Sequence, residues 1–77
     1  MITVMQSQDF TLLTEYIDLS QLLKAAGIAI SGGEAKMFVT DGLVMVNGEP
    51  ESRKRRKLRG GDVVVFNNEH KVCIITT

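Results

Sequence analysis

Six basic side chains lie within seven consecutive positions, in the run Arg53-Lys54-Arg55-Arg56-Lys57-Leu58-Arg59. The whole chain has nine basic and nine acidic residues, so the other seventy positions carry three basic groups against nine acidic ones, a net charge of −6. A basic segment on an acidic body indicates a docking site for a polyanion. Four of the six are arginine, whose planar guanidinium matches phosphate oxygens and can stack on an unpaired base. We expect this basic segment (residues 53–59) to bind nucleic acid; an acidic protein or an anionic lipid surface is the alternative.

A second candidate phosphate contact is the motif Ser31-Gly32-Gly33-Glu34. Serine followed three residues later by glutamate is a capping box, so a helix should begin here. The two glycines leave the amides of the first turn open to a phosphate at the positive end of the helix dipole. Lys36 lies one turn further along, where it could reach the same phosphate. The alternative is an ordinary cap, in which Ser31 and Glu34 satisfy the amides and Glu34 repels anions.

Residues suited to catalysis or metal binding are scarce. His70 and Cys73 supply two ligands at most, whereas a structural zinc site needs four and a catalytic one needs three plus water. Gly60-Gly61 lacks the spacing of a phosphate-binding loop, and no serine stands in a nucleophile-elbow pattern. We expect no enzymatic activity, no metal, no cofactor and no small-molecule substrate.

Length and composition limit the chain to one small domain. A chain of 77 residues buries only a small core. A single cysteine excludes an internal disulfide and suits a reducing cytosol. We see no secretory signal and no apolar run long enough to span a membrane. The expectation is a cytoplasmic protein without a membrane partner, with a frayed segment over residues 1–9 and a single domain over residues 10–77.

The first half of the chain should place the helices. Residues 10–17 mix apolar, Thr and Tyr positions and favour a strand. Asp18 followed by Gln21 is a capping-box pair, which predicts a two-turn helix ending at Gly27. The second helix should run from Ser31 to Gly42, with Lys36 on the side away from its apolar positions.

The second half reads as β structure. Residues 43–46 form an apolar strand, and Asn47-Gly48 is the signature of a type I′ hairpin. Pro50 excludes a central strand, so the returning segment should be an irregular or edge strand that carries the basic segment. Residues 60–62 turn the chain into a strand over 63–66, and a last strand covers 71–75. The predicted fold is α+β, with two short helices packed on a small antiparallel sheet of four to five strands.

Three segments, taken in order, resemble the RNA-binding domain first named for ribosomal small-subunit protein four. They are Ser-Gly-Gly-Glu-Ala-Lys at 31–36, Gly-Leu-Val-Met-Val-Asn-Gly at 42–48 and Leu-Arg-Gly-Gly-Asp-Val-Val at 58–64. The resemblance covers about residues 17–66 and is greatest to small stand-alone bacterial members. It implies an alpha-L motif, a helix pair resembling a helix-turn-helix laid on a sheet, which binds structured RNA without catalysis. Typical members carry several basic residues around the start of the second helix, where here only Lys36 matches, so the weight shifts to the basic segment.

We therefore expect a non-catalytic protein that binds structured RNA, such as ribosomal or transfer RNA, mainly through phosphates. With no Trp and few other aromatics, recognition should rest on shape and charge. The expected contacts are Arg53, Lys54, Arg55, Arg56, Lys57, Arg59, Lys36, Ser31, Gly32 and Gly33. Two alternatives stay open: a protein-interaction module that docks its basic edge on an acidic partner, and binding to duplex DNA. Neither expected helix carries the Asn, Gln or Arg set that reads base edges, which ranks DNA below RNA.

Overall fold

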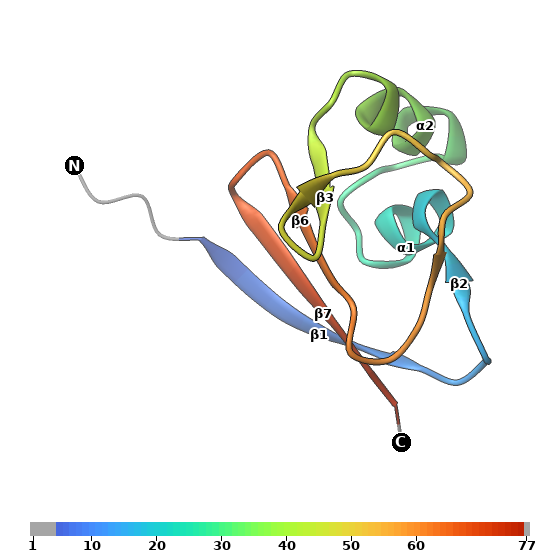
Figure 1. Ribbon diagram of the computed structural model, residues 1–77. Helices are drawn as coiled ribbons and strands as arrows, with labels where there is room; N and C mark the ends of the chain where they lie inside the picture. The colour runs from blue at the N-terminus through green and yellow to red at the C-terminus, as the bar shows by residue number, and fades with distance from the viewer. Residues whose placement is uncertain (1–4, 77) are drawn as a thin grey trace.

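The computed structural model describes residues 5–76, which form two helices and seven strands. Helix α1 spans Leu19–Ala25 and helix α2 spans Gly32–Thr40. The strands are β1 Gln6–Leu12, β2 Ile17–Asp18, β3 Val44–Val46, β4 Glu49–Pro50, β5 Lys57–Leu58, β6 Val63–Phe66 and β7 His70–Thr76. Figure 1 shows both helices on one side of the main sheet. The predicted α+β class with two short helices is confirmed.

The main sheet contains five strands within residues 5–76, in the order β1-β7-β6-β3-β4. Pairs from β7 to β4 are antiparallel, but β1 runs parallel to β7, with Gln6 opposite His70. The sheet is therefore mixed, and the predicted wholly antiparallel arrangement is wrong in this respect. Turn signals fix the direction of strands that are neighbours in sequence. A parallel pair such as β1 and β7 requires a long crossover, here the rest of the fold, and leaves no local signature.

The N-terminal strand begins earlier than the sequence suggested. Residues 6–9, expected to belong to a frayed segment, lie in β1 and pair with residues 70–73 of β7. The predicted strand over residues 10–17 is wrong over residues 13–16, where the chain leaves the sheet, and Ile17 belongs to the separate strand β2. Residues 1–4 of the expected frayed segment lie outside the described residues. The polar run was misleading because β1 is an exposed edge strand held by its ladder rather than by burial.

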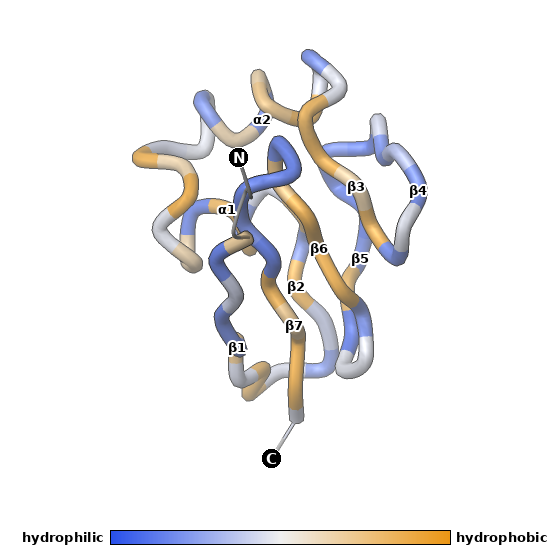
Figure 2. The backbone as a smooth tube through the Cα atoms, turned by 90° about the vertical axis from the view of Figure 1, so that its left-hand side faces the viewer, coloured by the Kyte–Doolittle hydropathy of each residue, from blue (hydrophilic) through white to orange (hydrophobic). Residues whose placement is uncertain are grey.

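A row of partnered side chains crosses the inner face of the sheet. Val46, Val64 and Val72 are consecutive register partners on β3, β6 and β7, and all three are buried. Gln8 extends the row on β1 and donates a hydrogen bond of 3.3 Å to the carbonyl of Ala26, just after α1. Figure 2 shows the hydrophobic strands β3, β6 and β7 beside the more hydrophilic β1. The helices cover this row with their buried residues, Leu19, Leu22, Leu23, Ala35 and Val39.

Two local motifs have the predicted geometry. The Ser31 hydroxyl accepts a hydrogen bond of 3.1 Å from the Glu34 amide, so α2 begins at the expected cap. Asn47 and Gly48 have φ values of 53° and 84°, the two positive angles that a type I′ turn needs. Both motifs depend on residues a few positions apart, which is why the sequence displays them.

The predicted capping box of α1 is wrong. Asp18 occupies the N-cap position, but its side chain makes no cap hydrogen bond in the part of the chain that the structure describes. Instead, the Leu19 amide donates to the Arg56 carbonyl at 2.9 Å and the Ser20 amide donates to the Lys54 carbonyl at 3.0 Å. The basic segment therefore caps this helix with its own backbone, because the short β2–β5 ladder brings the two segments together.

The returning segment was expected to be an irregular or edge strand that carries the basic segment; it forms the edge strand β4, but the basic segment itself lies outside the main sheet. The edge strand β4 ends at Pro50, and the following residues form an irregular loop with a turn at Lys54 and Arg55. The segment enters β structure again only at β5, which pairs with β2 in a separate two-stranded ladder. Leu58, which pairs with Ile17 in this ladder, is fully buried, so the core anchors the basic segment.

Candidate nucleic-acid interface

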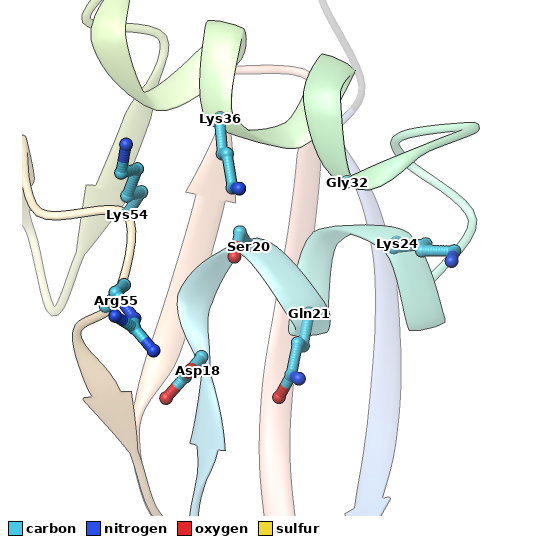
Figure 3. Close-up of a pocket in the computed structure, with 8 residues that line it drawn as sticks. All are labelled: Asp18, Ser20, Gln21, Lys24, Gly32, Lys36, Lys54 and Arg55. Carbon is cyan, nitrogen blue, oxygen red and sulfur yellow. The ribbon is translucent and has the colours of Figure 1, made fainter.

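A cleft of about 550 Å³ lies where the starts of both helices meet the basic segment (Figure 3). The β2–α1 side contributes Asp18, Ser20, Gln21 and Lys24; α2 contributes Gly32 and Lys36, and the basic segment contributes Lys54 and Arg55. Figure 3 shows Lys36 extending from α2 toward the start of α1, with Lys54 and Arg55 on the neighbouring loop. Three separate elements thus bring polar groups to one hollow.

The charge of this cleft is strongly positive. Its lining has four cationic side chains, Lys24, Lys36, Lys54 and Arg55, and among the described lining residues Asp18 is the one acid. Water-exposed cations gathered in a concave surface raise the local concentration of anions. The predicted residues Lys36, Gly32, Lys54 and Arg55 are therefore brought together by the fold. Lys24 was not predicted, although its place on the polar side of α1, three residues after Gln21, could have indicated it.

Two cations of the basic segment are held by a buried carboxylate instead. The side chain of Glu51 is 7% exposed, and its Oε1 lies 3.0 Å from Arg53 Nη2 and 2.8 Å from Arg56 Nη1. The other oxygen, Oε2, accepts from the amide and from Nε of Arg53, both at 3.0 Å. These bonds to Arg53, with the further bond from Arg56, lower the pKa of Glu51 to about 2 although burial acts in the opposite direction. Sequence reasoning missed Glu51, because an acid two positions before a basic run carries no recognisable pattern.

The last two cations of the segment flank an exposed aromatic ring. Lys57 Nζ lies 4.8 Å from the ring centroid of Tyr16, and the guanidinium carbon of Arg59 lies 5.8 Å from it. Both distances are in the cation–π range. Lys57 also lines a second hollow of about 590 Å³ together with Arg53, Arg55 and Arg56. The six cations therefore have different nearest contacts: Lys54 and Arg55 line the cleft, Arg53 and Arg56 bond Glu51, and Lys57 and Arg59 flank Tyr16, while four of the six also share the second hollow.

The end of the basic segment is tied to the β3–β4 hairpin. Asp62 accepts hydrogen bonds from the Arg59 amide at 2.8 Å and from the Asn47 side-chain amide at 3.0 Å. Asn47 in turn accepts from the Val63 amide at 2.9 Å. Burial acts to raise the pKa of Asp62, but the Arg59 and Asn47 hydrogen bonds outweigh it, and the pKa stays below its usual range. The Asn47-Gly48 and Gly61-Asp62 parts of the sequence pattern are thus joined by hydrogen bonds in the folded domain.

The start of α2 offers less open backbone than the sequence suggested. Ser31 is occupied by its cap bond, and the Glu34 carboxylate accepts from the Ile30 amide at 3.2 Å. Gly32 lines the cleft, whereas neither Ser31 nor Gly33 belongs to its described lining. A Cβ on Gly32 would meet nothing within 4 Å, so local packing does not require glycine there.

Residues 5–76 lack two other kinds of functional feature. These residues contain no group of three or more His, Cys, Asp or Glu side chains arranged to hold a metal ion. Neither of their helices has the length and apolar character needed to cross a membrane.

The fold and the cleft define an α+β domain in which a helix pair and a basic loop share one surface. The chain belongs to the S4 domain family, whose model matches residues 10–75. The resemblance to the domain of ribosomal small-subunit protein four is thereby confirmed, over a longer stretch than the three motifs alone.

Two bacterial relatives are similar over most of their length. A Bacillus subtilis (strain 168) protein, named probable ribosome maturation protein RlbA, is 53% identical over 51 residues, which are 66% of this chain and 72% of that protein. YbcJ from Escherichia coli (strain K12) is 38% identical over 60 residues, 78% of this chain and 84% of YbcJ. The solution structure of YbcJ superposes with a TM-score of 0.62 at 32% identity, covering 97% of this chain and 92% of that one. That structure is described as revealing an αL motif involved in RNA binding.

Proposed function

We propose that this protein binds structured RNA without catalysing a reaction, and that the RNA backbone enters the cleft between α1, α2 and the basic segment. The observation that carries the proposal is a hollow lined by four cations from three elements and by one acid among the described residues. The description of YbcJ as an RNA-binding αL protein supports it, because the two chains share fold and family.

Phosphates rather than bases are the proposed contacts. Phe10, Phe38 and Phe66 pack against the core, and the exposed ring of Tyr16 is flanked by Lys57 and Arg59. Little aromatic surface is therefore left for stacking on unpaired bases. Lysine and arginine side chains in a groove suit the closely spaced phosphates of folded RNA, which proteins read largely by shape and backbone.

Within the cleft, we assign direct phosphate contacts to Lys24, Lys36, Lys54 and Arg55, with the bare backbone of Gly32 beside them. Lys57 and Arg59 extend the basic surface toward Tyr16, and Arg53 and Arg56 contact Glu51. Ser31 and Gly33 shape the start of the helix. This division separates residues that the sequence presents as one uniform cluster. The proposal requires neither cofactor nor metal.

Ribosomal RNA is the partner class we favour, since the Bacillus subtilis relative is named for ribosome maturation. A cytoplasmic location follows from that partner. Crosslinking in cells followed by sequencing of the bound RNA identifies the target. Enrichment of ribosomal RNA fragments supports the proposal. If other RNA dominates the crosslinked population, ribosomal RNA is not the partner.

A competition experiment tests the class of nucleic acid. Labelled RNA hairpin is bound at fixed salt and displaced with unlabelled hairpin or with a DNA duplex of equal length. We expect the hairpin to compete at much lower concentration, because neither helix start presents a set of side chains that would read base edges in a DNA groove. Competition by the duplex at a lower concentration than the hairpin favours duplex DNA, and equal competition shows charge-driven binding without a preference for RNA. If ribonuclease treatment of purified complexes leaves an acidic protein bound, the protein-interaction alternative is the correct one.

A further inference from the structure

Glu51 stands at the point where the chain leaves β4 and begins the basic segment. It is almost completely buried, and its carboxylate accepts four hydrogen bonds, three from Arg53 and one from Arg56. We propose that Glu51 is the positioning residue of the RNA-binding surface: it fixes the loop so that Lys54 and Arg55 face the cleft. This inference rests on the RNA-binding function proposed above.

The bonds to Glu51 enclose the two residues that it positions. Lys54 and Arg55 form the turn between Arg53 and Arg56, so both flanking residues are fixed by the same carboxylate. The Arg53 fork is anchored through its main chain as well as its guanidinium, which sets the direction in which the turn starts. On the opposite side, the carbonyls of Lys54 and Arg56 accept the first amides of α1. The backbone of the turn is thus held from both sides while its cationic side chains stay free to contact RNA.

The effect expected of Glu51 on RNA binding is opposite in sign to the effect of its charge alone. A negative charge inside an RNA-binding surface repels phosphates, so removing it should strengthen binding if charge alone mattered. Burying a carboxylate without hydrogen-bond partners costs free energy. Its bonds to Arg53 and Arg56 avoid this cost and hold both residues in place. Without the carboxylate, the backbone of the turn must be ordered when RNA binds. Ordering this backbone is expected to weaken binding by about tenfold, more than one distant charge contributes.

Glu49 provides a matched control. It lies two positions earlier on the same hairpin, is exposed, and forms no ion pair in the described part of the chain. Glu49→Gln and Glu51→Gln remove the same charge from neighbouring positions. We expect Glu51→Gln to bind an RNA hairpin about tenfold more weakly than wild type, and Glu49→Gln to bind equally or more tightly. If Glu51→Gln binds as tightly as Glu49→Gln, the positioning role is overturned.

A double-mutant cycle distinguishes positioning from general destabilisation. In a Lys54→Ala/Arg55→Ala background, adding Glu51→Gln should cost little further affinity, because the side chains that it positions are gone. The same tenfold loss in that background overturns the proposal. If Glu51→Gln does not fold, Arg53→Lys replaces it. That variant keeps the charge but loses the fork, and unchanged hairpin affinity would overturn the proposal.

A measurement without RNA tests the role of Glu51 independently of RNA binding. The Leu19 and Ser20 amides are bonded to the loop, so their hydrogen exchange reports its order. We expect faster exchange at both in Glu51→Gln and unchanged exchange in Glu49→Gln. If the wild-type protein does not bind the hairpin, the proposed RNA-binding function is wrong. The exchange rates still decide whether Glu51 holds the loop.

Discussion

Leu58 is the apolar position inside the basic segment, and it explains how so much like charge can be held together. Its side chain is fully buried, while its neighbours Lys57 and Arg59 lie beside the Tyr16 ring. Alternation along a strand places one residue inward and its two neighbours outward. The core therefore anchors a surface whose charges repel one another.

Replacing Leu58 with alanine should destabilise the whole domain, by about 2–5 kcal/mol for a fully buried leucine. Urea denaturation measures the change in the free energy of unfolding. Leu13→Ala is the control, because Leu13 is 82% exposed and its loss should change stability by less than about 0.5 kcal/mol. Equal stability of the two variants would show that Leu58 does not anchor the segment.

Glu51 also predicts an acid sensitivity. Its pKa is lowered from 4.5 to about 2, so the native state favours the ionised form more than the unfolded chain does. This contribution to stability is complete above the unfolded pKa of 4.5 and is lost as the pH falls toward 2. Wild type and Glu49→Gln should therefore lose more stability between neutral pH and acid than Glu51→Gln does. The free energy of unfolding at several pH values checks this, and parallel profiles for Glu49→Gln and Glu51→Gln would contradict it.

At the scale of elements, helix α2 begins with two glycines that have different surroundings. Gly32 lines the cleft and Gly33 does not, and neither has a positive φ. Alanine fits at both, because a Cβ on Gly32 meets nothing within 4 Å and one on Gly33 lies 3.9 Å from Ser31 Oγ. Both alanine variants should keep or slightly raise the stability of the domain, as alanine favours helix more than glycine does.

Their RNA affinities should differ. Gly32→Ala places a methyl group where a phosphate would approach the bare backbone, and we expect weaker hairpin binding; Gly33→Ala should bind like wild type. Fluorescence anisotropy with a labelled hairpin measures both. If the two variants bind alike, the backbone at the start of α2 is not a contact.

Elements whose signals are local could be predicted, and those built by distant partners could not. The Ser31 cap and the Asn47-Gly48 turn depend on residues a few positions apart, and the structure has both. The pairing of β1 with β7 and the burial of Glu51 depend on segments brought together only by the fold. For the same reason, the sequence identified the basic segment but not which of its cations face the cleft.

At the scale of the whole molecule, charge is divided between a basic surface and an acidic body. With four cations in the cleft, the logarithm of RNA affinity against the logarithm of salt concentration should slope by about −3 to −4. Lys54→Glu/Arg55→Glu should flatten the slope by about two, since two phosphate contacts are lost. Thermal unfolding checks that this variant still folds.

Lys71→Glu is the corresponding control. Lys71 lies on β7 next to the buried Val72, so its side chain is on the opposite face of the sheet from the helices. This charge reversal should leave the slope unchanged and alter affinity only slightly. A similar slope for wild type and Lys54→Glu/Arg55→Glu would remove these residues from the interface.

The backbone cap of α1 also makes RNA binding depend on how much of the chain has been synthesised. A helix of seven residues is only marginally stable by itself. The carbonyls that accept hydrogen bonds from its first amides lie about 35 positions further along the chain. The helix and the loop therefore stabilise each other. During synthesis, we expect the emerging chain to have no affinity for RNA until Arg56 and the strands that follow have left the ribosome.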